Sequence, residues 1–146
     1  MNIRVASAAD VSRIAEIFVF NNRINYFPIF GDESYSFGEL QVLTVARELT
    51  PERLGGIFVY DDGIVRGFVE LCGEEIKRLY VDPFFQGRGI GSALIEFAAE
   101  RGCHCLWALE KNEGAIRFYE RHGFARTGER KPEEGTAEYL IMLSRN

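Results

Sequence analysis

The sequence predicts one α/β domain with a single mixed, mostly antiparallel central sheet and helices on both of its faces. Two segments rich in β-branched and aromatic residues, 56–60 and 64–72, flank a short Asp-Gly turn, which is typical of a β-hairpin. Strand-like and helix-like segments then alternate from residue 76 to residue 122, which requires at least one parallel pair of strands. No linker, repeat or low-complexity segment divides residues 1–146, so we expect a single domain.

The composition favours a globular protein that does not bind nucleic acid or membranes. The 146 residues are 47% hydrophobic and 13% aromatic, enough for a sizeable core. Seventeen Lys and Arg residues against 22 Asp and Glu give a net charge of -5, which suits a cationic substrate better than a polyanion. We expect a cytoplasmic protein, because no run of 18 apolar residues and no signal-peptide pattern occurs. Three cysteines are too few, and odd in number, for a disulfide framework.

The first elements are predicted to be a strand and a helix. Residues 3–6 are strand-like, and Ser7 and Asp10 have the spacing of a capping box, which begins a helix. The apolar stripe of this helix is Val11, Ile14, Ile17 and Phe18. A second helix is expected within residues 39–50.

Between these helices, the aromatic segment "NNRINYFPIFGDESYSF" at residues 21–37 fits neither the helical nor the strand period. We expect an irregular or partly helical flap whose rings cover a cleft. Tyr26, Phe30 and Tyr35 are the residues expected to line an acceptor-substrate pocket there. The alternative is a lid that only completes the core.

The central strand "EIKRLYVD" breaks the alternation expected of a regular strand. Ile76, Leu79 and Val81 are not spaced by two, so a regular strand cannot direct all three side chains to one face. A β-bulge near residues 78–80 would reconcile them, and bulges are common beside active sites. The alternative is a strand buried on both faces, for which alternation is unnecessary.

The remaining segments continue the α/β pattern. A helix is expected to begin near Gly89 and to end before Gly102. A strand, a helix and two further strands follow, at residues 105–109, 114–122, 124–130 and 138–143. The sequence Cys-His-Cys at 103–105 has no second Cys or His pair to complete a metal site, so we expect no metal.

Three glycines, Gly87, Gly89 and Gly91, lie between the central strand and the next helix. Their number suggests a positive φ or the close approach of a ligand to the backbone. The unpaired amides and the dipole of the helix N-terminus favour an anion, and Arg88 adds a full charge. The turn therefore predicts a site for a phosphate or pyrophosphate group.

Two nucleotide-binding motifs fit this turn less well. The sequence lacks the Gly-Lys-Ser/Thr of a Walker loop, and its glycines read G-x-G-x-G instead of the dinucleotide fingerprint G-x-G-x-x-G. Glu110, about 20 residues on, keeps the dinucleotide alternative open, because an acidic residue there binds ribose in that fold.

Two motifs together resemble the GNAT superfamily of N-acetyltransferases. The stretch "LYVDPFFQGRGIGSALIEFA" is similar to that family's Q/R-x-x-G-x-G/A signature for acyl-CoA, carried by Gln86, Gly89 and Gly91. At the expected distance, "LEKNEGAIRFYERHGF" resembles its second motif, with matches at Asn112, Ala115, Phe118, Tyr119, Gly123 and Phe124. The resemblance covers nearly the whole chain, and residues 21–37 are its least typical part.

The resemblance implies acetyl-CoA as co-substrate and a primary amine as acceptor. The pyrophosphate would be held by the turn amides of Gln86, Gly87, Arg88, Gly89, Ile90, Gly91 and Ser92. The backbone of Leu79, Tyr80 and Val81 would pair with the pantetheine arm, with an amide near Val81 on the thioester oxygen. Asn112 and Phe118 would also contact the cofactor, although Asn112 is equally suited to cap the following helix.

The resemblance also implies two catalytic roles. Tyr119 would assist the departure of the coenzyme thiolate, and the alternative is a tyrosine that only packs. Glu75 would accept the proton of the amine, and Glu70 and Glu110 are the other candidate acceptors. The alternative for Glu75 is a solvated residue at the tip of a hairpin, without a catalytic role. A catalytically silent acyl-CoA-binding domain is the alternative to an enzyme. The sequence leaves open the acceptor, the length of the acyl chain, and whether the protein is a monomer or a homodimer.

Overall fold

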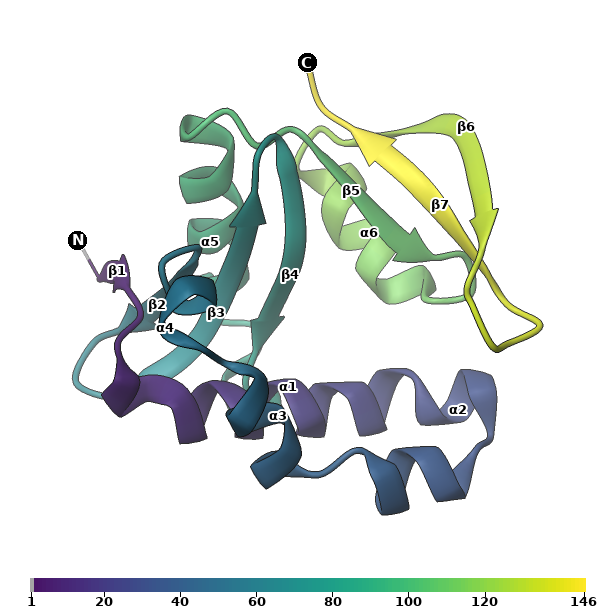
Figure 1. The fold of residues 1–146 in the computed structure, drawn as a ribbon. Coiled ribbons are helices and arrows are strands. Elements are labelled where there is room, and N and C mark those ends of the chain that lie inside the picture. Colours follow the sequence, from purple (N-terminus) through teal and green to yellow (C-terminus); the bar gives the residue numbers. More distant parts are fainter. Residues whose placement is uncertain (1) are drawn as a thin grey trace.

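A computed structural model describes residues 2–146 and contains one seven-stranded sheet in the order β1-β2-β3-β4-β5-β7-β6 (Figure 1). The strands are β1 (Ile3–Val5), β2 (Ile57–Asp61), β3 (Val65–Cys72), β4 (Glu75–Val81), β5 (Cys105–Leu109), β6 (Ala125–Pro132) and β7 (Tyr139–Ser144). Only β4 and β5 are parallel among these strands; the other pairs are antiparallel. The expected fold class is confirmed.

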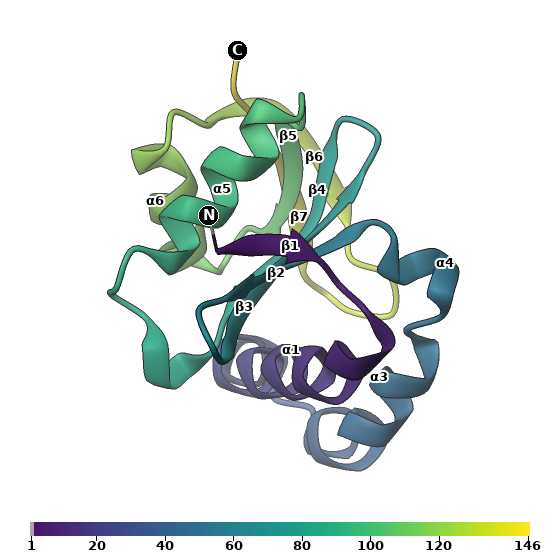
Figure 2. The same ribbon diagram turned by 90° about the vertical axis from the view of Figure 1, so that its left-hand side faces the viewer.

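Helices cover both faces of the sheet. They are α1 (Val11–Asn25), α2 (Phe27–Phe30), α3 (Val42–Glu48), α4 (Pro51–Leu54), α5 (Ile90–Glu100) and α6 (Glu113–Arg121). Figure 2 shows α5 and α6 on one face and α1 with α3 on the other. Consecutive residues of β3 face the two layers: Val69 packs in the core beneath α5, and Phe68 packs in the core beneath α1. No helix within residues 2–146 is long and apolar enough to cross a membrane.

Strands β4 and β5 pair at one end and then separate (Figure 1). Their register contains one residue pair, Glu75 with Cys105, supported by hydrogen bonds from the backbone N–H groups of His104 and Cys105 to the carbonyl of Glu74. Beyond this pair, β5 is bound to β7 over its full length. The sheet is therefore open along the carboxyl half of β4.

The bulge expected in β4 is confirmed, but it lies at Lys77, one residue before the expected range. Leu71 pairs with Ile76 and Glu70 with Arg78, so Lys77 is an extra residue on β4. Because of this insertion, Ile76, Leu79 and Val81 all contact the core beneath α5. The opposite face of β4 directs Tyr80 towards α1.

The flap is more regular than its sequence pattern indicates. Helix α1 continues to Asn25, α2 follows, and Ser34–Glu39 forms one stretch of π-helix. Gly31, with φ of 67°, ends α2. The capping box at the other end of α1 is also present, since the Asp10 carboxylate accepts a hydrogen bond from the backbone N–H of Ser7 over 2.8 Å.

Candidate active site

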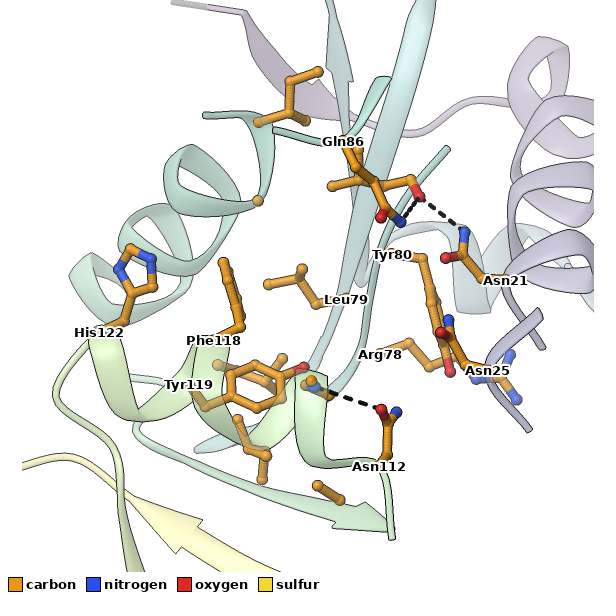
Figure 3. Close-up of a pocket in the computed structure, with 18 of the residues that line it drawn as sticks. Asn21, Asn25, Arg78, Leu79, Tyr80, Gln86, Asn112, Phe118, Tyr119 and His122 are labelled. Atoms are coloured by element: carbon orange, nitrogen blue, oxygen red, sulfur yellow. Dashed lines mark hydrogen bonds between the residues drawn. The ribbon is translucent and has the colours of Figure 1, made fainter. Parts of the chain in front are cut away.

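A cavity of about 520 Å³, the first cavity, lies between β4, β5, α5 and α6 (Figure 3). Figure 3 shows Phe118 and Tyr119 of α6 on one side of it, opposite Tyr80 of β4 and Asn25 of α1. The residues expected to bind the cofactor that line it are Leu79, Tyr80, Val81, Gln86, Gly87, Gly89, Ile90, Gly91, Ser92, Asn112 and Phe118. The structure thus brings together residues from both sequence motifs.

The backbone of β4 presents free polar groups where it leaves β5. The N–H of Asp82 donates to the carbonyl of Arg66, so in this antiparallel register Tyr80 and Asp82 are the residues that bond to β3. The N–H groups of Leu79 and Val81 consequently point away from β3, towards the side where β5 has diverged. Two amides therefore face the first cavity without a strand partner.

The carbonyl of Val81, which belongs to the peptide bond with Asp82, accepts hydrogen bonds from two side chains. The Nδ2 of Asn21 donates to the Val81 carbonyl over 2.9 Å, and the Nε2 of Gln86 does so over 3.3 Å (Figure 3). Asn21 is only 2% exposed and also bonds to the carbonyl of Ile17. Sequence reasoning missed Asn21; an asparagine that follows the apolar residues 17–20 of a helix is only a weak signal.

The glycine turn has the geometry that its composition suggests. Gly87 and Gly89 have φ of 79° and 82°, and Gly89 is the N-cap of α5. A Cβ at Gly89 would meet no atom within 4 Å, so the turn is open on the side where a ligand would approach. Gly91 has a different role: a Cβ there would lie 3.2 Å from two ring atoms of Phe118, so its absence lets α5 contact α6. The side chain of Arg88 does not line the first cavity and lies over the ring of Phe85 instead.

A serine and a histidine form a pair at the start of α5. The Ser92 hydroxyl lies 3.1 Å from Nε2 of His122, and Nδ1 of His122 lies 3.7 Å from the carboxylate of Glu96. Arg145 binds this carboxylate over 3.0 Å, and its hydrogen bond is the first cause that lowers the pKa of Glu96. His122 was missed, because only the packing of α6 on α5 brings it to the turn.

Tyr119 has the environment of a neutral hydrogen-bond donor. Burial, followed by the influence of Tyr26, raises the pKa of its phenol well above the ordinary value. Its hydroxyl makes no hydrogen bond to any residue in the described chain, and the side chain lines the first cavity (Figure 3). Asn112 also lines the cavity, but its Oδ1 accepts a hydrogen bond from the N–H of Ala115, which is the capping role.

A second cavity of about 920 Å³ lies on the flap side of the same opening. Its lining includes Glu75 and the three flap residues expected at the acceptor site, Tyr26, Phe30 and Tyr35. The two cavities share Tyr26, Lys77, Arg78, Tyr80, Trp107, Ala108 and Leu109. They therefore meet beside the place where β4 and β5 separate.

Two tyrosines mark this junction. The hydroxyls of Tyr26 and Tyr80 are 3.0 Å apart, which connects the end of α1 to β4. Burial is the first cause that raises the pKa of each, so both phenols remain neutral. Neither tyrosine can therefore act as a strong base near neutral pH.

The charges of the first cavity suit an anionic ligand. Its lining contains Lys77, Arg78 and Arg121 but no aspartate or glutamate. Of the other carboxylates considered as proton acceptors, Glu70 is bound by Arg53 over 2.8 Å and Glu110 by Arg130 over 3.0 Å. Glu75 remains, and it lines the second cavity only. The pairing of Glu110, together with the antiparallel strands before β4, removes support for a dinucleotide fold.

The open mixed sheet with helices on both faces is the fold of a known family of acetyltransferases. The family model described as an acetyltransferase (GNAT) domain matches residues 53–126, which is half of the chain. The peptidyl-lysine N-acetyltransferase YjaB of Escherichia coli is 30% identical over 99 residues, covering 67% of each chain. The chain therefore belongs to the GNAT family of acetyltransferases, as the two motifs predicted.

Other similar proteins agree with this assignment. An uncharacterized N-acetyltransferase of Methanocaldococcus jannaschii is 52% identical over 56 residues, but these cover 34% of this chain and only 25% of that protein. The solution structure of apo YjaB from Escherichia coli superposes with a TM-score of 0.78 at 24% identity, covering 97% of this chain and 95% of that one. A PaiA N-acetyltransferase from Thermoplasma acidophilum in complex with coenzyme A gives a TM-score of 0.67 at 18% identity, covering 96% of both chains.

Proposed function

We propose that this protein transfers the acetyl group of acetyl-CoA to a primary amine by direct attack of the amine on the thioester. The observation that carries the proposal is the opening between β4 and β5, where two cavities meet beside the free N–H groups of Leu79 and Val81. A thioester in the first cavity and an amine in the second would meet at this opening. The charges support the placement of the anionic cofactor in the first cavity, because the charged side chains that line this cavity are all cationic.

The cofactor would be held mainly by backbone groups. The amides at residues 86–92 and the N-terminus of α5 would bind the pyrophosphate. The pantetheine arm would extend beside β4 and bond to the amides that β5 does not use. The N–H of Val81 would then donate to the thioester oxygen, where negative charge builds up in the transition state. Asn21 and Gln86 would help to position Val81 by bonding to its carbonyl, in the peptide bond that follows this N–H.

The reaction would form a bond between the amine nitrogen and the carbonyl carbon and break the bond from that carbon to sulfur. The attacking amine must first lose a proton, either to Glu75 or to water in the second cavity. The departing thiolate would receive a hydrogen bond from the Tyr119 hydroxyl. Because the pKa of Tyr119 is raised, a hydrogen bond that strengthens as charge develops is favoured over full proton transfer.

Release of free thiol from acetyl-CoA in the presence of different amines tests this proposal. Lysine-containing peptides are the first acceptors to try, since YjaB carries the name peptidyl-lysine N-acetyltransferase. Amine-dependent thiol release, with a mass increase of the amine by one acetyl group, supports the proposal. Tight binding of acetyl-CoA without turnover of any amine would support the silent acyl-CoA-binding domain instead.

A further inference from the structure

The second cavity contains more negative charge than its own cations balance. Five of its carboxylates form no ion pair with any described residue: Asp32, Glu39, Glu75, Glu133 and Glu134. Glu70 is a sixth, but Arg53 neutralises it. Lys77 and Lys131 are the lysines in the lining, and neither has an ion pair in the described chain. Carboxylates from the flap and from the β6–β7 hairpin therefore surround a space with a net negative potential.

A buried amide in this cavity lacks a partner. Asn22 is 7% exposed, lines the second cavity, and forms no side-chain hydrogen bond with residues 2–146. No fully buried side-chain nitrogen or oxygen of residues 2–146 lacks a partner, so the unbonded Asn22 amide is reached from the cavity, where a ligand group can bond to it. Phe18 and Asn22 of α1 and its C-cap Tyr26 are spaced by four residues and all line this cavity, so they present one continuous face to it.

Glu133 brings a carboxylate to this face from the other side. The hairpin around it is fixed, because its N–H donates to the carbonyl of Glu138 and its carbonyl accepts from the N–H of Thr136. Glu133 is half-buried, and after burial it is a second influence that raises the pKa of Tyr26. The charge of Glu133 therefore acts at the face that contains Asn22 and Tyr26.

Two of the chain's own cations that line this cavity lie over aromatic rings. The Lys131 ammonium lies 4.2 Å from the ring centroid of Trp107, and the Arg78 guanidinium lies 4.3 Å from that of Phe18. These contacts show that aromatic rings of the cavity hold cations on their faces. Neither cation forms an ion pair with Glu133, so the carboxylate of Glu133 is available to a further cation.

We propose that the acceptor carries a second positive charge besides the attacking amine, and that Glu133 and Asn22 bind this second cation; the inference rests on the proposed function. The neutral amine would sit at the junction near Tyr26, while the second cationic group would donate to the Glu133 carboxylate and the Asn22 amide oxygen. The shared chemistry is that of an alkyl diamine or of a lysine next to another basic residue in a peptide. Glu133 is thus a residue that determines specificity.

The test compares pairs of acceptors that differ only in this charge. 1,5-Diaminopentane is compared with pentylamine, and a lysine peptide with a neighbouring lysine is compared with one that has glutamate there. We expect the wild-type kcat/KM to favour the dicationic member at least 10-fold in one of the two pairs, and which pair shows it identifies the source. The preference should decrease as salt increases, because the interaction is between charges.

Substitutions at Glu133 and Asn22 test whether these residues cause the preference for a dicationic acceptor. Glu133→Gln should lower the ratio of diamine to monoamine kcat/KM by about 10-fold, and Asn22→Leu should lower it as well. Glu129→Gln is the matched control, since Glu129 is an exposed carboxylate on the same strand-hairpin unit and lies outside the second cavity. It should retain the wild-type ratio.

Equal kcat/KM within each wild-type pair, or a ratio unchanged in Glu133→Gln, overturns the inference. Calorimetric binding of the two five-carbon amines separates this failure from failure of the proposed function. If no amine is acetylated but the diamine binds more tightly and Glu133→Gln removes the difference, the cation site stands and the proposed catalysis fails. If amines are acetylated without preference for a second charge, the catalysis stands and the cation site fails.

Discussion

The side-chain amide of Asn21 donates a hydrogen bond to the carbonyl oxygen of Val81 over 2.9 Å and thereby ties α1 to β4 where that strand leaves the sheet. Asn21→Leu keeps a similar volume but leaves this carbonyl with only the longer bond from Gln86. Since Asn21 itself is almost fully buried, we expect the free energy of unfolding in urea to fall by about 1–3 kcal/mol.

Asn25 offers the matched control for this change. It lies one turn further along α1, lines the same cavity, and forms no side-chain hydrogen bond in the described part of the chain. Asn25→Leu should cost well under 1 kcal/mol of stability. Equal losses for the two variants would mean that the Asn21 bond contributes nothing beyond the amide's polarity.

Tyr119→Phe removes a hydroxyl and keeps the ring that packs against Phe118 and Phe124. We expect kcat to fall by about 10²-fold and the affinity for acetyl-CoA to stay within about two-fold, because the donor acts on the leaving thiolate. Single-turnover kinetics and equilibrium binding separate the two effects. An unchanged rate of the chemical step would make Tyr119 a packing residue.

The raised pKa of Tyr119 sets a condition on the pH profile. A phenol whose pKa is above its ordinary value stays protonated, and keeps its donor, up to a higher pH than a free phenol. The wild-type kcat should therefore show no loss from ionisation of this group between pH 7 and about pH 10. A decrease within this range that Tyr119→Phe abolishes would contradict the assignment.

Gly89→Glu places a side chain and a negative charge at the N-terminus of α5. We expect it to abolish detectable binding of coenzyme A, because a carboxylate would compete for the site proposed for the pyrophosphate and the positive φ would be strained. Gly102→Glu at the other end of α5 is the control, since Gly102 has nearly the same φ, 81° against 82°. A folded Gly89→Glu protein with wild-type affinity would locate the cofactor elsewhere.

The ion pair of Arg4 should contribute to stability in a pH-dependent way. It binds the buried carboxylate of Asp10 over 2.8 Å, and this hydrogen bond is the first cause that lowers the pKa of Asp10. Because the folded pKa is below the unfolded value, the contribution is present above about pH 4 and is lost as the pH falls further through the folded pKa. Arg4→Met should lower the urea midpoint at pH 7 much more than at pH 2.

A surface ion pair provides the comparison for Arg4. Arg130 pairs with Glu110, and both side chains are well exposed. Arg130→Met should therefore change the free energy of unfolding by less than about 1 kcal/mol. If Arg4→Met and Arg130→Met lower the free energy of unfolding equally at pH 7, the burial of Asp10 adds no stability to its ion pair.

The sequence predicted those features that depend on neighbouring residues. The broken alternation of Ile76, Leu79 and Val81 is a local signal, and it identified a bulge that the register places at Lys77. Gly87 and Gly89 likewise have the positive φ that the turn requires. The length of α1 was underestimated because its second half carries aromatic and polar residues that face two cavities.

Features that depend on tertiary packing were not predictable in the same way. His122 reaches Ser92 only because α6 packs beside α5, and Glu133 lines the same cavity as the flap only because the last hairpin folds towards it. Residues so far apart in the chain leave no spacing pattern for a single sequence to reveal. Asn21 and Asn22 carried a weak signal, but a helical asparagine by itself does not say which strand or cavity it faces.

The single residue pair between β4 and β5 also has a mechanical consequence. Within residues 2–146, the strands before this point and those after it share one backbone pairing, so the last three strands are fastened to the rest mainly by helix packing. An extended ligand bonded to the exposed edge of β4 would add contacts between strands β1–β4 and strands β5–β7. The ligated protein should resist amide hydrogen exchange along β4 and β5 far better than the free protein, and at 100 times Kd the ligand should add about 2.7 kcal/mol to stability.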